Sequence, residues 1–427
     1  MLRLYLLLVL SLFVSVQMSA QVTLKECIAL AEENYPIISK YDLLEQTKEV
    51  NLSNINKGWL PQINVYGQGT VQNDTPSLPE SLTNIINQTG TNIAGLNEWQ
   101  YRIGADISQN IWDGGTSKVH RKIERAEDAE RQAAIDVQLY AVRERVEDLY
   151  FGILLMDAQI EQVKNMQLLL QSNLDKLRIM QSNGTAMQSD VDMVEAEYLG
   201  TVQQLTQAES ASQSYRNVLG LFMGKSIVGQ KLVKPEAFIP QDMMPSRPEL
   251  KYFEKQLQTN EARNASITAN MMPKIGLFAQ LYYGYTGFDY FENMMNRNPS
   301  FNILAGVKLS WNIGALYNKK NDRMKLKLSS DNINVERDIF LFNINLQSRS
   351  QLDHIDELKA VIKNNDRIVE LRTNVRKAAE SQLDNGVIDA TALLTKLTDE
   401  KQARLTAAYH EIQLLQSIYE LKYTLNK

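Results

Sequence analysis

The sequence of 427 residues is poor in the side chains that carry most enzyme and metal chemistry. It contains one cysteine, Cys27, which excludes an internal disulfide, and we interpret Cys27 as a small buried hydrophobic residue on the first helix. Its three histidines are far apart in sequence and show no metal-ligand spacing; they are His120, His354 and His410. No Walker loop, nucleophile elbow or zinc signature is present. We therefore expect no catalytic residue, no metal site and no cofactor, and the protein is not expected to be an enzyme.

The sequence also has no excess of basic residues and, after its N-terminal stretch, no long hydrophobic run. The formal net charge of −5 argues against nucleic acid as a partner, because such proteins carry basic patches. Arg3, the apolar stretch 4–16 and the small residue Ala20 predict a secretory signal peptide over 1–20; a packed N-terminal helix is the alternative. No later run approaches the roughly 20 apolar residues of a membrane-spanning helix. The mature chain, from residue 21, is expected outside the cytoplasm.

Matched intervals divide the sequence into two halves. The spacing is 25 positions from proline to proline, 74 from asparagine to glycine, and 40 from that glycine to the next matched residue. These residues are Pro36, Pro61, Asn110, Gly184 and Gly224 in the first half, and Pro248, Pro273, Asn312, Gly386 and Asn426 in the second. The intervals predict an internal structural duplication with repeats at 21–224 and 247–427, joined by a proline-containing linker or equatorial segment, 225–246.

Four segments alternate apolar and polar residues with a period of two, which predicts β-strands with one apolar face and one mostly polar face. They are 61–72, 100–112, 274–285 and 301–313. A sheet with one solvated face would give the same alternation. Strand length favours a membrane, since soluble strands average about 5 or 6 residues and tilted membrane strands need about 9 to 11.

Aromatic residues gather at the ends of these segments, which is typical of a barrel that crosses a bilayer. We expect the following to lie at the membrane interface: Trp59, Trp99, Trp112, Trp311, Tyr283 and Tyr285. On the polar faces, Arg102, Asp106 and Lys308 are expected to point into a water-filled lumen, with an ordinary wettable face as the alternative. Four strands cannot close a barrel, and an open sheet edge in hydrocarbon leaves backbone groups unpaired. The chain is therefore expected to assemble with copies of itself.

The rest of each half is predicted to be helical. A helix precedes each strand pair, at 24–57 and 247–270, and a long helix follows it, at 115–183 and 316–384. The long helices carry heptad patterns and end at Asn-Gly, where glycine permits the left-handed conformation. About 68 residues at 1.5 Å each give a coiled-coil rod of about 100 Å. Return helices are predicted at 188–222 and 389–424.

Three segments resemble the bacterial outer-membrane efflux proteins, the TolC-like trimeric channel-tunnels. They are 23–36, which opens the first helix, 247–250 (Arg-Pro-Glu-Leu), which opens the second, and 108–115 (Ser-Gln-Asn-Ile-Trp-Asp-Gly-Gly), which is similar to the family's strand-to-helix corner. The resemblance implies a homotrimer with a twelve-stranded transmembrane β-barrel and a periplasmic α-barrel of long helical hairpins. It also implies the outer membrane of a Gram-negative cell.

By this resemblance the protein is a passive exit duct of a tripartite efflux or type I secretion system. Its implied partners are outer-membrane lipid, a periplasmic adaptor (membrane fusion) protein and an inner-membrane RND or ABC transporter. The helical tunnel is expected to extend into the periplasm and to open by an iris-like untwisting of its helices. The adaptor is expected to contact the hairpin tips at Asn183, Gly184, Thr185, Asn385, Gly386 and Val387.

Family gates carry acidic residues six and nine positions past the second turn, but here those positions are Ala392 and Thr395. The nearest acids, Asp190, Asp192 and Asp389, are the candidate gate residues. The alternative is that they stabilise helix starts, where a carboxylate accepts hydrogen bonds from free amides and interacts favourably with the helix dipole.

Three other functions remain open from the sequence. Adjacent methionines occur at 243–244, 271–272 and 294–295, and their thioethers would suit copper or silver, so a duct for the efflux of these metals is one alternative. Adjacent side chains, however, point in different directions and chelate a metal poorly. A secreted structural coiled-coil protein would explain the heptads but not the long amphipathic strands. A stand-alone porin would have no use for helices of about 100 Å.

Overall fold

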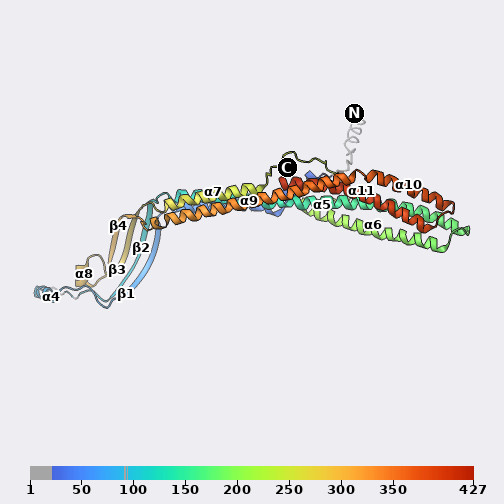
Figure 1. The fold of residues 1–427 in the computed structure, drawn as a ribbon. Coiled ribbons are helices and arrows are strands. Elements are labelled where there is room, and N and C mark those ends of the chain that lie inside the picture. Colours follow the sequence, from blue (N-terminus) through green and yellow to red (C-terminus); the bar gives the residue numbers. More distant parts are fainter. Residues whose placement is uncertain (1–21, 91–92, 94) are drawn as a thin grey trace, which may run out of the picture. The chain divides into compact units, whose positions relative to one another are not determined.

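The computed structural model describes residues 22–90, 93 and 95–427, so the predicted signal peptide lies outside the described residues. The described chain is mostly helical and contains a four-stranded antiparallel sheet, as predicted (Figure 1). The first half contains α2 (Leu24–Asn34), the 3-10 turn η1 (Pro36–Ile38), α3 (Ser39–Lys57), β1 (Gln62–Val71), α4 (Glu80–Asn87), β2 (Trp99–Trp112), α5 (Thr116–Ser182) and α6 (Gln188–Met223). The second contains α7 (Pro248–Ala269), β3 (Lys274–Tyr285), α8 (Tyr290–Asn296), β4 (Ser300–Ser310), α9 (Ala315–Ile362), α10 (Asn365–Asp384) and α11 (Ala390–Leu425).

The chain divides into two compact units, each built from both halves of the sequence. The helical unit comprises the residues up to Asp42 together with Gln132–Tyr252 and Val335–Lys427. The sheet unit comprises Leu43–Arg131 and Phe253–Asn334, and it contains all four strands.

Proline interrupts the first predicted helix. The segment predicted as one helix over 24–57 consists of α2, the turn η1 and α3. Pro36 lacks the amide hydrogen that a continuing helix needs, and Tyr35 before it is extended, with ψ of 129°. The interruption follows from a residue that is visible in the sequence.

The long helix predicted over 316–384 is also interrupted, between α9 and α10. The break comprises Lys363 and Asn364, and α10 begins at Asn365. Asn365 is buried, and its amide group lies 3.3 Å from Nδ1 of His410 on α11. A specific contact with the return helix thus stabilises the break. By contrast, α5 is continuous from Thr116 to Ser182.

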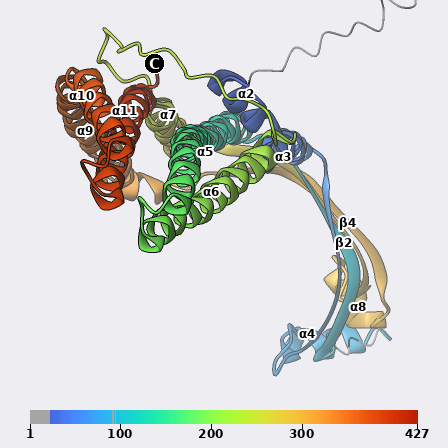
Figure 2. The same cartoon turned by 90° about the vertical axis from the view of Figure 1, so that its right-hand side faces the viewer.

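The strands lie in the order β1-β2-β3-β4, and each pairs antiparallel with the next. The register places Val65 opposite Ala105, Ala105 opposite Leu281, and Leu281 opposite Ile303. All four strands bend the same way, so the sheet is curved (Figure 2). The short helices α4 and α8, which the periodicity did not predict, lie in the connections between β1 and β2 and between β3 and β4.

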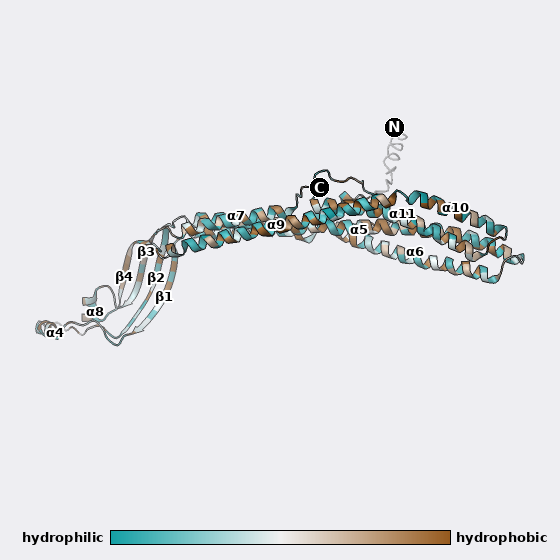
Figure 3. Cartoon of the chain, in the orientation of Figure 1, coloured by the Kyte–Doolittle hydropathy of each residue, from teal (hydrophilic) through white to brown (hydrophobic). Residues whose placement is uncertain are grey.

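The helical unit has an extensive apolar core. Residues of α2, α5, α6 and α11 meet in one buried cluster, and the predicted seam of α5 contributes Val142, Val146 and Ile153. Hydrophilic and hydrophobic residues follow one another in short stretches along α5 and α9, as in amphipathic helices (Figure 3). Cys27 lies in this cluster, as predicted, and burial raises the pKa of its thiol to about 12. None of the helices in the described ranges has a stretch long and apolar enough to cross a bilayer.

The linker between the halves is anchored to the N-terminal segment. Val22 donates to the carbonyl of Lys231 at 3.2 Å and accepts from the amide of Val233 at 3.1 Å. The hydroxyl of Tyr150, which is 0% exposed, donates to the carbonyl oxygen of Val233 at 2.6 Å, and the carbonyl oxygen of Val22 lies 2.9 Å away. Tyr150 therefore links α5 to both strands of this bridge.

The substitution Tyr150→Phe is expected to lower the free energy of unfolding by about 1–2 kcal/mol, because it removes the hydroxyl that donates to the carbonyl oxygen of Val233. Thermal denaturation of the full-length protein in detergent, followed by far-ultraviolet circular dichroism, measures the change. Tyr409→Phe, at an exposed tyrosine of α11, is the matched control and should leave the transition unchanged. Equal stability of the two variants would contradict a structural role for the Tyr150 hydroxyl.

Candidate functional site

One face of the sheet is apolar on every strand, and it is exposed. Because odd-numbered residues pair with odd-numbered residues across the sheet up to Asn110, their side chains share one face. On successive strands Val65, Ile103, Leu277 and Val307 are 73%, 63%, 43% and 68% exposed. A continuous apolar surface of this kind marks a site that contacts another protein or a membrane.

The other face carries the predicted lumen residues. Arg102 donates to Oε1 of Gln68, directly opposite on β1, from Nη2 at 2.8 Å and from Nε at 3.0 Å. Its guanidinium also lies 5.7 Å from the ring centroid of Tyr66 and 5.8 Å from that of Tyr282. Those two rings flank Gly104, where a Cβ atom would lie 2.4 Å from the Leu281 carbonyl oxygen, so only glycine fits. The arrangement fixes the position of the Arg102 charge.

Asp106 and Lys308 share this face but do not join Arg102 in a cluster. Asp106 lies between Asn64 and Gln280, and its Oδ1 atom is buried with no hydrogen-bond partner among the described residues. Lys308 lies opposite Gly276 and is exposed. Among the described residues, the structure therefore places Arg102, Asp106 and Lys308 as separate charges along one face of the sheet.

The tryptophans mark both ends of the strands. Trp59, Trp112 and Trp311 lie at the end joined to the helices, whereas Trp99 lies at the loop end of β2. Trp112 and Trp99 are 13 residue steps apart (112 − 99), or about 43 Å along the strand, and a tilt of about 40° reduces this to about 33 Å of depth. This depth suits an apolar band of about 25 Å flanked by aromatic girdles. The indole Nε1 of Trp311 donates to the carbonyl of Met271 at 3.0 Å.

Of the six predicted interface aromatics, Tyr285 is not exposed. Its ring is 2% exposed and packs with Leu96 and Met294. Its hydroxyl accepts from the amide of Asn97 at 2.9 Å and donates to the carbonyl of Asn293 at 3.4 Å. Tyr285 therefore joins the two loops at the far end of the sheet, whereas Tyr283 is exposed on the apolar face.

The two hairpin tips have the same backbone geometry. Gly184 and Gly386 have φ of +75° and +70°, in the left-handed region that glycine tolerates. Thr185 donates from its amide to the carbonyl of Met180 at 2.9 Å, and Val387 donates to that of Gln382 at 2.8 Å. These bonds over five positions close each helix as in the Schellman motif. Asn183 and Asn385 precede the glycines as predicted, and all six tip residues remain accessible at the surface.

The three candidate gate acids have local hydrogen-bond partners. Oδ1 of Asp389 accepts from the amide of Ala392 at 2.8 Å, which makes Asp389 the N-cap of α11. Oδ2 of Asp190 accepts from the amide of Met187 at 3.0 Å in a capping box at the start of α6. Asp192 accepts from Nε2 of Gln188 at 2.6 Å. The geometry of Asp190 and Asp389 is that of the helix-start alternative.

The two hairpins pack against each other near their tips. Leucine and valine side chains of α5 and α6 share a buried cluster with Leu383, Leu393 and Leu397 of α10 and α11. Nζ of Lys176 lies 3.1 Å from both carboxylate oxygens of Asp384 across the same contact. Opening between the hairpins would expose this cluster and separate the ion pair.

A buried ion network in the second hairpin was not predicted from the sequence. The Glu400 carboxylate is 3% exposed; it accepts from the Thr373 hydroxyl at 2.8 Å and from Nε of Arg376 at 2.6 Å. Nε of Arg404 donates to it at 2.9 Å. Burial alone raises the pKa of Glu400, but the hydrogen bonds from Thr373, Arg404 and Arg376 outweigh burial and hold the pKa below the ordinary value. Only the four-residue spacing of Glu400 and Arg404 was visible beforehand.

No metal-binding constellation forms in the described part of the chain, where no three histidine, cysteine or acidic side chains could hold one ion together. In two of the three methionine pairs the neighbours diverge, since Met271 and Met294 are buried while Met272 and Met295 are exposed; Met243 and Met244 are both exposed. This is the divergence expected of adjacent residues.

Comparison of the sequence with protein-family models and with curated proteins finds no match. Solved structures do match. The outer-membrane channel OprN aligns with a TM-score of 0.67 at 13% identity, over 94% of this chain and 89% of that one. The outer membrane protein VceC from Vibrio cholerae gives 0.66 at 11% identity, over 94% and 95%. The Campylobacter jejuni CmeC outer membrane channel gives 0.65 at 13% identity, over 94% and 85%.

This chain has the fold of an outer-membrane channel. The outer-membrane channel fold extends over nearly the whole sequence, in line with the resemblance inferred from residues 23–36, 108–115 and 247–250. At these levels of identity the likeness establishes the fold alone.

The substitution Glu400→Gln is expected to destabilise the protein by about 2 kcal/mol, because it removes a buried carboxylate shared by Arg376 and Arg404 and leaves Arg376 paired with Glu380 alone. Glu357→Gln, which alters an exposed pair with His354, is the control and should change the thermal transition little.

The effect should depend on pH in a defined direction. Because the pKa of Glu400 is lowered by folding, its stabilisation is present above the ordinary glutamate pKa and is lost as pH falls through the folded-state pKa. The difference in melting temperature between wild type and Glu400→Gln should therefore shrink on acidification. A difference that stays constant down to pH ~3, well below the ordinary value, would contradict a charged, hydrogen-bonded Glu400.

Proposed function

We propose that the protein is the channel-tunnel through which a tripartite efflux or type I secretion system releases its substrates across the outer membrane. The observation that carries the proposal is the sheet: one face is apolar and exposed on all four strands, the other is polar, and both edges are open. Within the described residues β1 and β4 pair with no strand on their outer sides. Unpaired backbone groups in hydrocarbon cost several kcal/mol each, so such a sheet must close before it spans a bilayer.

Closure by identical subunits gives the proposed assembly. In a homotrimer, β4 of one subunit would pair with β1 of the next, and three four-stranded sheets would make a barrel of twelve strands. The proposed duplication is consistent with the order of elements, because each half supplies a helix, two strands and a long helical hairpin. The likeness to outer-membrane channels supports the same arrangement.

The helical hairpins would form the periplasmic tunnel. Their tips, Asn183 to Thr185 and Asn385 to Val387, would meet a periplasmic adaptor, and an RND or ABC transporter in the inner membrane would supply the energy. The duct itself would be passive, consistent with a lining of single charges. We propose that opening separates the two hairpins, so that the Lys176–Asp384 pair and its apolar cluster, rather than acidic residues at 392 and 395, resist opening.

Membrane extraction and conductance test the proposal. The full-length protein should remain in the membrane fraction at high salt, dissolve only in detergent, and form discrete conductance steps in planar bilayers. Lys308→Glu should shift the reversal potential in a salt gradient toward cation selectivity, because it reverses a charge on the polar face of β4. Lys308→Arg keeps the charge and should leave the reversal potential unchanged. Release by salt alone would instead support a secreted coiled-coil protein.

Site-specific crosslinking tests the adaptor contact. Thr185→Cys and Val387→Cys, labelled with a bifunctional thiol reagent in whole cells, should each capture a periplasmic protein. Cys27 provides a built-in control, because it is buried and its thiol pKa of about 12 keeps it protonated and unreactive. Capture by Tyr409→Cys, on an exposed site of α11 outside the tips, as efficiently as by the tip variants would count against the assignment.

A further inference from the structure

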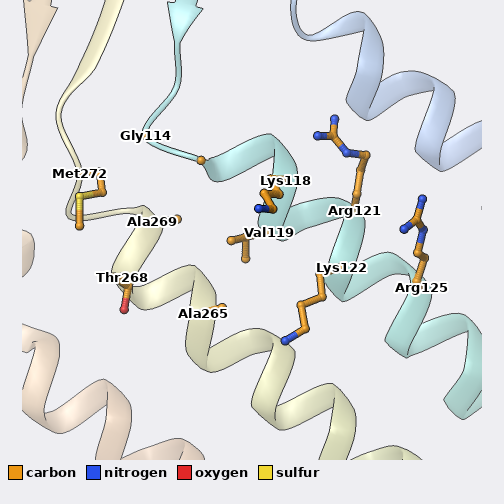
Figure 4. Close-up of a pocket in the computed structure, with 11 residues that line it drawn as sticks. Gly114, Lys118, Val119, Arg121, Lys122, Arg125, Ala265, Thr268, Ala269 and Met272 are labelled. Atoms are coloured by element: carbon orange, nitrogen blue, oxygen red, sulfur yellow. The ribbon is translucent and has the colours of Figure 1, made fainter.

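A groove of about 750 Å³ lies in the sheet unit, where α5 begins and α7 ends (Figure 4). One wall is the first two turns of α5, with Lys118, Lys122 and Arg125. The other is the last turn of α7, where Ala265 and Ala269 leave a shallow apolar surface. In Figure 4 Lys122 extends toward α7, whereas Arg121 and Arg125 extend to the opposite side of α5. The groove combines an apolar floor with a cationic rim.

The cations of this rim lack counter-ions. The side chains of Lys118, Lys122 and Arg125 are exposed and form no ion pair or hydrogen bond with any residue that the structure describes. The acids that follow on α5 are occupied elsewhere: Glu124 pairs with Arg131, Glu127 with Arg263, and Asp128 with Lys48. The excess positive charge is therefore confined to the start of the helix, beside the groove.

Two of these cations share one face of α5. Lys118 and Lys122 are exposed there, because a spacing of four residues places them about one turn apart. Glu124 and Glu127 lie about half a turn away at 3.6 residues per turn, and there they contact Asn51 of α3 and Arg263 of α7. The cationic face is thus free to meet a ligand from outside the helical layer.

The position of the groove identifies the ligand. Gly114 follows Trp112, the last residue of β2, by two positions, and Met272 precedes β3 by two. The groove therefore lies at the aromatic end of the sheet, where a bilayer would place its headgroups. The start of α5 is not itself an anion site, because Asp113 already accepts from the amides of Gly115 at 2.9 Å and Ser117 at 2.7 Å.

We infer that this groove binds the headgroup phosphate of an anionic glycerophospholipid from the adjoining leaflet. The phosphate would lie beside Lys118 and Lys122, with Arg125 adding positive charge nearby, and the acyl chains would follow exposed apolar residues of the strands such as Leu277. Lysine and arginine near an anionic membrane surface are attracted to it, and their apolar stems can lie along the groove while their charges reach the phosphate. The inference rests on the proposed membrane function of the sheet.

The second half of the chain repeats the same chemistry. The two halves are offset by 202 positions here, the interval from Asn110 to Asn312. The residues that correspond to Lys118, Arg121 and Arg125 are therefore Lys320, Arg323 and Lys327. One contact is repeated as well: Arg121 donates to Oδ1 of Asn56 at 3.0 Å, and Arg323 donates to Oγ1 of Thr268 at 3.3 Å. The repeat is partial, because the counterpart of Lys122 is Met324.

The matching groove of the second half is incomplete in one chain. A smaller hollow of about 500 Å³ lies on α3, lined by Ser53, Asn56, Lys57 and Leu60. At this place the two halves are offset by 212 positions, the interval from Pro61 to Pro273. The four residues therefore correspond to Ala265, Thr268, Ala269 and Met272 of the first groove. Because Glu49 also lines this hollow, we assign no second lipid site to it.

Lipid retention tests the inference. The full-length protein is extracted in mild detergent from vesicles of phosphatidylglycerol and phosphatidylcholine, and the lipids that remain bound are counted by native mass spectrometry. The wild type should retain phosphatidylglycerol in preference to phosphatidylcholine. Lys118→Gln/Lys122→Gln/Arg125→Gln should retain about tenfold less, because it removes three charges that attract the headgroup.

A matched triple variant, Arg145→Gln/Lys363→Gln/Lys377→Gln, removes three exposed charges of the helical unit and should retain lipid as the wild type does. Retention by the wild type should also fall as salt concentration rises, a readout that needs no variant. Equal retention of both lipids, equal loss in the two triple variants, or complete displacement of lipid by equimolar inorganic phosphate would each overturn the lipid site. Protein that enters the bilayer without lipid preference would leave the proposed function intact, whereas protein that does not enter would overturn both.

Discussion

The sheet has one apolar face and two open edges, and no arrangement of a single chain satisfies both features. If a single sheet lay in water, its apolar face would be exposed to solvent. If it lay in hydrocarbon, the amide and carbonyl groups of its two edge strands would have no hydrogen-bond partners. A closed ring of several sheets satisfies both at once. In the proposed ring, the long strands and the aromatic residues at both strand ends would match the thickness of a bilayer, and the polar face would line enclosed water.

Register maintains this division into two faces. A slip of one residue between any two strands would move every apolar side chain to the polar face. Here Val65, Ala105, Leu281 and Ile303 stay in line across four strands, and the only irregularity, between Asn110 and Trp112, falls at the helix end. A bulge at that place re-aims the chain as it leaves the sheet and enters α5.

Local signals in the sequence were sufficient for the strands, for the Asn-Gly turns and for the continuity of α5, because each depends on periodicity or on the conformational freedom of glycine. Pro36 could have predicted the break between α2 and α3. The break at Asn364 depends on the buried contact of Asn365 with His410, and the Glu400 network joins residues more than twenty positions apart, so neither follows from local pattern. Tyr285 and the exposed Tyr283 are the same residue type on the same strand. Tyr285 is buried because it packs against residues of the adjoining loops, which the local sequence does not reveal.

The last helix also imposes an order on folding. Leu421 and Leu425 of α11 are fully buried, and the hydroxyl of Tyr140 donates to the Tyr423 carbonyl at 2.5 Å. The rings of these two tyrosines stack, and the Arg247 guanidinium lies 4.6 and 4.7 Å from their centroids. The core around α5 is therefore closed by a contact between residues 283 positions apart in the sequence. Such a non-local contact forms only after a large loop closes, so the helical core is expected to assemble slowly and to expose apolar surface while it does so.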